Sequence, residues 1–128
     1  MESNFYINDA GYAKAEFSSP YELIGWFLSS EIGGSIEELN FYLSRIEDVK
    51  SGKLTKFEAD GNAHIIRIDK EHVQIIDFFL LDADDHPDHP ENNITFALKM
   101  FEEIIAQWLK LISQNVKDYQ YQYVNEVI

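Results

Sequence analysis

Apolar and polar residues alternate near the start of the chain in a way that indicates two short strands. Residues 5–7 form an apolar run, and in residues 13–18 Ala13, Ala15 and Phe17 alternate with polar side chains. Between them, residues 8–11 contain Asn, Asp and Gly, which are typical of turns. The pattern therefore predicts a β-hairpin.

Two helices are predicted next, each from a capping pattern at its start. Ser19 is expected to cap the first helix, with Glu22 three residues later, and the pair Gly33-Gly34 is expected to end it. Ser35 and Glu38 repeat the capping pattern. The second helix then carries apolar residues at three- and four-residue spacing, namely Ile36, Leu39, Leu43 and Ile46.

The middle of the chain predicts a three-stranded meander, and a long amphipathic helix follows later. Strands are expected at residues 54–59, 62–68 and 72–80, with a tight turn at Asp60-Gly61. The final helix is expected over residues 94–112, where its apolar stripe comprises Ile94, Ala97, Leu98, Phe101, Ile104, Ile105, Trp108, Leu109 and Ile112.

These elements predict an α+β fold: an antiparallel sheet of about five strands packed with three α-helices, in the order ββααβββα. A chain of 128 residues has the size of one domain, so residues 1–128 are expected to form a single domain. Residues 119–128, rich in tyrosine and glutamine, leave three alternatives open: an edge strand, a dimer contact or a frayed end.

Composition and charge narrow the class of protein. The chain carries a net charge of −13, concentrated in residues 1–49 and 81–128, and it contains no cysteine. Such acidity disfavours direct nucleic-acid binding and would speed association with a basic protein. No apolar run is long enough to cross a membrane, and no signal-peptide pattern is present, so a cytoplasmic protein is expected.

The most polar stretch, residues 81–93, raises the question of a metal site. It places His86 and His89 among five carboxylates, and each histidine is followed directly by a proline, Pro87 or Pro90. Nitrogen and oxygen ligands would suit zinc, nickel or manganese. The spacing matches no helical metal motif, however, so a solvated acidic loop is favoured and neither a metal nor another cofactor is expected.

Other candidate chemistry is sparse. His64 and His72 fall on or beside neighbouring predicted strands, where they could pair, although a structural histidine is the commoner outcome. The chain has no nucleophile elbow, phosphate-binding loop or Cys–His pair. An enzyme is therefore not expected, although a metal-dependent or acid–base hydrolase using His86, His89 and nearby carboxylates remains an alternative.

Several local motifs carry a resemblance to small acidic bacterial proteins. They are Asp9-Ala10-Gly11, Ala13-x-Ala15-x-Phe17-Ser18, Glu22-x-Ile24-Gly25-Trp26-Phe27 with Glu31, Ile46-Glu47-x-Val49-Lys50-Ser51-Gly52, Gly61-Asn62 and Ile68-Asp69-x-x-x-Val73. Together they resemble a group that includes the YacL family and the immunity proteins of contact-dependent growth inhibition (CDI) systems. The resemblance covers roughly residues 4–112.

An immunity protein of this kind is implied to bind and neutralise the C-terminal toxin domain of a cognate CdiA effector, typically a nuclease, in the cytoplasm. No binding residue transfers from the family, so the contact is predicted from charge and aromatic character. The expected partner-binding residues are Asp82, Asp84, Asp85, Asp88, Glu91, Glu37, Glu38 and Tyr42, with Trp26 as a further aromatic anchor. A housekeeping interaction protein of YacL type is another alternative, and the oligomeric state stays open.

Overall fold

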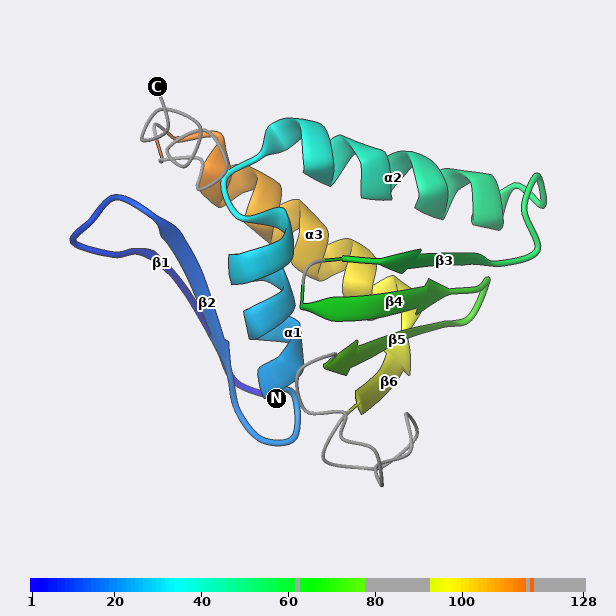
Figure 1. The fold of residues 1–128 in the computed structure, drawn as a ribbon, viewed down its shortest axis with the longest axis horizontal. Helices are drawn as coiled ribbons and strands as arrows, with labels where there is room; N and C mark the ends of the chain where they lie inside the picture. The colour runs from blue at the N-terminus through cyan, green and yellow to red at the C-terminus, as the bar shows by residue number, and fades with distance from the viewer. Residues whose placement is uncertain (62, 78–92, 115, 117–128) are drawn as a thin grey trace.

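The computed structural model describes residues 1–61, 63–77, 93–114 and 116 of the chain. Figure 1 shows the order of its elements along the chain and their arrangement. The elements are β1 (Ser3–Ile7), β2 (Ala13–Phe17), α1 (Glu22–Phe27), the π-helical turn η1 (Leu28–Ile32), α2 (Ile36–Lys50), β3 (Phe57–Asp60), β4 (His64–Ile68), β5 (His72–Asp77), β6 (Asn93–Ala97) and α3 (Leu98–Ile112).

Helix α1 lies between two sheets. On one side is the antiparallel hairpin β1–β2, and on the other is a four-stranded antiparallel sheet in the order β3-β4-β5-β6 (Figure 1). The close approach of α1 to β2 requires a glycine, because a Cβ at Gly25 would lie 2.5 Å from the backbone oxygen of Ala15. Ile24 and Phe27 on this helix are almost completely buried.

The four-stranded sheet has two different faces. Its inner residues are apolar and join the core, and they include Ile66 and Ile68 of β4 and Val73 and Ile75 of β5. Helix α3 crosses behind the sheet in Figure 1 and contributes the fully buried Trp108. The side chains that alternate with the inner residues point to the opposite face. One row of that face consists of Glu58, Arg67, Gln74 and Thr95, which are paired across the four strands.

The structure confirms the predicted fold class and the element order, with two differences in strand arrangement. The hairpin β1–β2 forms a sheet of its own. Residues 93–97, expected from Ile94 onward to be helical, form the edge strand β6, and α3 begins only at Leu98. Ile94 and Phe96 are buried while Thr95 is exposed, which is strand alternation. The spacing of Ile94, Ala97 and Leu98 also suits a helix, hence the error.

Element boundaries differ from the predictions mainly at the starts of elements. Ser19 does not cap α1: this helix begins at Glu22, and its N-cap residue Tyr21 makes no side-chain cap. Ser35 does cap α2, as predicted, because its Oγ accepts the backbone N–H of Glu38 at 3.1 Å. Strands β3 and β4 each begin two or three residues later than expected. The predicted end of β5 at residues 78–80 and the tail 119–128 lie outside the described residues.

Candidate functional site

The first candidate site is built on Glu31, a carboxylate buried at the end of the first helical segment. After Phe27 the helix widens into the π-helical turn η1, where the Gly33 N–H donates to the Leu28 carbonyl five residues earlier, at 2.8 Å. Such π-type turns are rare and occur frequently at functional sites. Glu31 lies in this turn and is only 7% exposed.

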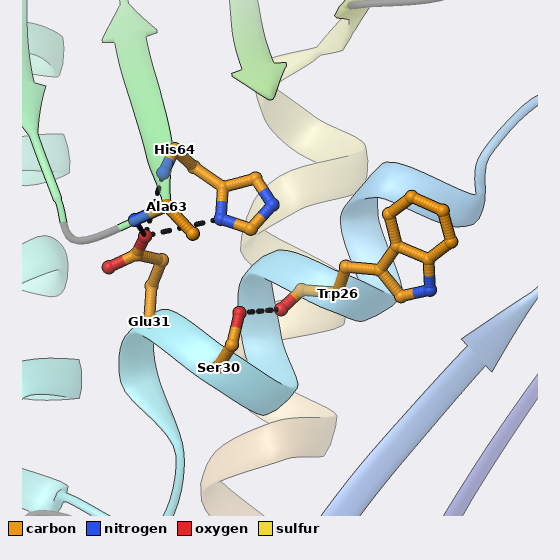
Figure 2. A network of polar contacts seen from close by, with 5 residues as sticks. All are labelled: Trp26, Ser30, Glu31, Ala63 and His64. Atoms are coloured by element: carbon orange, nitrogen blue, oxygen red, sulfur yellow. Dashed lines mark hydrogen bonds and ion pairs between the residues drawn. The ribbon is translucent and has the colours of Figure 1, made fainter. Parts of the chain in front are cut away.

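Glu31 joins the helical layer to the hairpin between β3 and β4. Its Oε1 accepts the backbone N–H groups of Ala63 and His64 at 2.5 and 2.7 Å and lies 3.1 Å from His64 Nδ1 (Figure 2). A Cβ at Gly61 would collide with the same carboxylate, so a larger residue there would displace Glu31 from these contacts. The carboxylate therefore caps the start of β4 from a helix 33 residues away.

The Glu31–His64 pair has the connectivity of an acid–histidine dyad. A carboxylate accepts only, so its contact places a proton on His64 Nδ1 and leaves Nε2 for other chemistry. His64, however, is 3% exposed, and its Nε2 is buried with no hydrogen-bond partner. The ring packs edge-on against Phe27, with centroids 6.0 Å apart. Nε2 is thus closed to a substrate in this structure, and the pair acts as a structural link.

The second candidate site is the acidic first turn of α2, just beyond the Gly33-Gly34 corner. Glu37 is exposed, and Glu38 is partly exposed. Burial raises the pKa of the Glu38 carboxyl, with further increases from the charges of Glu31 and Glu37. A helix N-terminus by itself favours carboxylates. The raised pKa therefore means that burial and neighbouring negative charge together outweigh the helix dipole at Glu38.

Tyr42 was predicted to contact a partner, and the structure corrects this. Its side chain is buried at 4% exposure and meets Phe27 edge-on, with ring centroids 5.6 Å apart. Burial and the charges of Glu38 and Glu31 raise the pKa of its hydroxyl. Tyr42 therefore belongs to the core, because a residue so enclosed offers no surface to a partner.

Phe41, one residue earlier, takes the exposed position that was expected for Tyr42. Its ring is 41% exposed, lies 5.7 Å from the ring of Phe57 in β3, and has the guanidinium of Arg45 at 5.4 Å. Ile36, in the first turn of the same helix, is 42% exposed. Helical spacing would have identified Phe41, because Glu37 and Phe41 are four residues apart on one face.

The other predicted site residues are distributed as follows. Trp26 is 53% exposed on α1, and its indole points away from the Glu31–His64 pair (Figure 2). His64 and His72 do not pair, because they sit at opposite ends of the β4–β5 register. Five predicted contacts and both loop histidines lie outside the described residues: Asp82, Asp84, Asp85, Asp88, Glu91, His86 and His89.

The described residues contain no group of three or more His, Cys, Asp or Glu side chains placed to hold a metal ion. In the same part of the chain, no helix combines the length and apolar character needed to span a bilayer.

Comparison with protein families identifies the relatives of this chain. The model of the family described as "Uncharacterised protein family (UPF0231)" matches residues 1–97, about three quarters of the chain, including α2 and both members of the Glu31–His64 pair. The chain belongs to the UPF0231 family. The predicted identity as a CDI immunity protein is therefore wrong: the motifs that suggested it are turns, glycines and aromatic residues, which report a fold rather than an activity.

Individual relatives agree with this assignment. The chain is 26% identical over 125 residues to a UPF0231 protein of Shewanella oneidensis, covering 91% of this chain and 100% of the relative. A UPF0231 protein of Shewanella putrefaciens is 23% identical over the same shares of both chains. One from Proteus mirabilis is 29% identical over 75 residues, 59% of this chain and 60% of the relative. No solved structure matches the chain.

Proposed function

We propose that this UPF0231 protein acts by binding, and that it docks a basic protein partner on the N-terminal half of α2. The contact surface, called the α2 face below, consists of Ile36, Glu37, Glu38 and Phe41. The observation that carries the proposal is the combination of crowded carboxylates with two exposed apolar side chains on one turn and a half of helix.

Electrostatics supply the first argument. Partial burial raises the pKa of Glu38, and the nearby charges of Glu31 and Glu37 raise it further. This arrangement costs stability in the isolated protein. A lysine- or arginine-rich partner would relieve the repulsion, and the net charge of −13 would accelerate the encounter.

The exposed apolar side chains supply the second argument. Interfaces typically combine a desolvated aromatic or aliphatic anchor with a polar rim. Phe41 is already held in place by Phe57 and Arg45, so its ring would lose little conformational freedom on binding. Ile36 adds a second exposed apolar side chain in the acidic turn. The absence of cysteine suits a reducing compartment, so we place this binding in the cytoplasm.

The test begins with a photo-crosslinking amino acid at Asn40, which is exposed between the acidic turn and Phe41. The protein crosslinked in cells is identified by mass spectrometry, purified, and titrated calorimetrically against the UPF0231 protein. Glu37→Lys should weaken the complex about tenfold, because it reverses an exposed interfacial charge. Raising the salt concentration should weaken the wild-type complex more than the variant complex.

Glu103→Lys is the matched control, since Glu103 is an equally exposed glutamate on α3. It should leave the affinity within about twofold of wild type. Equal losses for Glu37→Lys and Glu103→Lys would show that only overall charge matters and would remove the α2 face from the proposal. Phe41→Ala should weaken the complex without changing its salt dependence.

A further inference from the structure

A groove on the outer face of the four-stranded sheet is distinct from the α2 face. It has a volume of about 740 Å³ and lies over the row Glu58, Arg67, Gln74 and Thr95 and the turn beside it. In Figure 1, α3 lies behind this sheet, on the side of the inner residues. The volume falls in the range of small-molecule sites.

The groove holds one guanidinium in a fixed position. Arg67 Nε pairs with Glu58 Oε2 at 3.2 Å, and Arg67 Nη1 donates to Gln74 Oε1 at 3.3 Å. Gln74 is itself oriented, because its Nε2 donates to Asn93 Oδ1 at 3.2 Å. Hydrogen bonds therefore link Arg67 to β5 and β6, and the ion pair with Glu58 holds it from the β3 side. Its Nη2 makes no hydrogen bond to any residue the structure describes.

Both acids of the groove are engaged within the protein. Glu58 is paired with Arg67, and Asp69 Oδ1 accepts the backbone N–H groups of Glu71 and His72. Lys56 forms no ion pair within the described part of the chain, and it lines the same groove as Arg67 and His72. In a strongly acidic protein, this groove thus brings a lysine, an arginine and a histidine together.

Phe57 and Ile68 are paired across β3 and β4 and alternate with Glu58 and Arg67, so their side chains point to the inner face. The side chains that the outer face presents to the groove are therefore polar. We infer that the groove binds a small oxyanion, one carboxylate or phosphate group received by Arg67 and Lys56. Guanidinium and ammonium groups both bind such oxyanions through charge-assisted hydrogen bonds.

The experiment is an amide NMR titration of the full chain in a buffer without phosphate. Benzoate and phenyl phosphate are the anionic probes, and benzyl alcohol is the neutral probe of the same ring. We expect saturable shifts at residues 56–58, 67 and 74 with at least one anion, at a dissociation constant of about 1 mM or tighter, and none with benzyl alcohol. Which anion binds decides between a carboxylate and a phosphate ligand.

Variants connect binding to the named donors. Lys56→Gln and Arg67→Gln should each weaken the bound anion about tenfold, the loss of one charge-assisted contact. Lys99→Gln, an exposed lysine on α3, is the matched control and should bind as wild type does. Lys56 is exposed, so its variant stays interpretable even if Arg67→Gln fails to fold. Non-saturable shifts with both anions, or equal binding by Lys56→Gln and Lys99→Gln, would overturn the inference.

Discussion

Glu31 and the pair Glu37 and Glu38 are carboxylates on opposite sides of one glycine corner, yet their surroundings differ. Glu31 is buried, and it receives two backbone N–H groups and the Nδ1 of a histidine. The pKa of Glu38 is raised, first by partial burial and then by the charges of Glu31 and Glu37. Glu31 stabilises the fold, whereas Glu37 and Glu38, which begin six positions later, repel each other and Glu31.

This difference separates structural from functional acidity. A buried carboxylate with three donors has its desolvation compensated, and removing it leaves those donors without a partner. Exposed carboxylates crowded at a helix end stabilise little and are available to a partner. Net charge alone cannot make this distinction, because every carboxylate counts equally in the −13.

The largest effect is expected from Glu31→Ala. Removal of one member of a buried, hydrogen-bonded pair should lower the free energy of unfolding by about 3–5 kcal/mol, measured by urea denaturation. Glu31→Gln keeps an oxygen for the two backbone donors at residues 63 and 64, so its loss should be smaller, about 1–2 kcal/mol.

Equal losses for the alanine and glutamine variants would mean that charge, rather than the three accepted contacts, determines the role of Glu31. A loss below about 1 kcal/mol for Glu31→Ala would contradict the structural role of Glu31, since the buried carboxylate would then stabilise the fold no more than a surface one.

The ionisation of Tyr42 provides a second test, because its hydroxyl senses the charges of both Glu31 and Glu38. Its pKa is raised by burial, Glu38 and Glu31, so the unfolded chain ionises first as the pH passes 10.0. The folded state keeps the proton up to a higher pH, so the free energy of unfolding falls as the pH rises above 10. Between pH 9 and 11, wild type should lose up to about 1.4 kcal/mol more than Tyr42→Phe, measured by urea unfolding.

An equal alkaline loss in the two proteins would show that Tyr42 ionises as easily in the folded state as in the unfolded one. The enclosure of its ring by Phe27 would then fail to restrict the hydroxyl. At pH 7 the two proteins should differ little, which provides the internal control.

Much of the fold could be predicted from local pattern. The cap at Ser35 and the apolar stripe of α3 follow from spacing that one element sets by itself. The hairpin between β3 and β4 was also predicted, but its two-residue turn at Asp60-Gly61 is wrong, because Asp60 is the last residue of β3 and pairs with Ile65. Strand β6 was not predicted, because the spacing of its apolar residues suits both a strand and a helix. The backbone contact from Leu98 N to Glu71 O, at 2.9 Å, is a tertiary bond that no local pattern reveals.

The site could be predicted only in part. Glu37 and Glu38 were identifiable because they are local, first-turn acids at a cap. The link from Glu31 to His64 was not, because it spans 33 residues and depends on a π-helical turn. In the sequence, only glycines indicate this link. The Gly33-Gly34 corner follows Glu31, and Gly61, near His64, lies where a Cβ would collide with the Glu31 carboxylate.

Ser35→Ala tests the cap at the exposed start of α2, beside Glu37 and Glu38. The variant loses the oxygen that accepts the Glu38 N–H, which should cost about 1 kcal/mol and lower the melting temperature by about 4 °C. Ser44→Ala, at an exposed position in the middle of the same helix, is the control and should change little. Because α2 begins next to the crowded acids, Ser35→Ala should also reduce binding to the partner proposed for the α2 face.

The smallest effect is expected from Glu38→Gln, and its sign is the decisive feature. The folded pKa of Glu38 is raised above its ordinary 4.5, so its favourable contribution exists only in acid and disappears as the pH rises through the folded value. At pH 7 the neutral variant should therefore be more stable than wild type. Solvent screening at this partly exposed position limits the gain to about 0.3 kcal/mol.

Below pH 4 the advantage of Glu38→Gln should vanish, because Glu38 is then protonated in both states. Glu47→Gln, at an exposed position two turns further along α2, should show no such gain at pH 7. A Glu38→Gln variant that gains stability and loses affinity for the partner at the same time would show that the same carboxylate destabilises the free protein and contributes to binding. A loss of stability at pH 7 would instead place Glu38 with Glu31, among the acids that hold the fold together.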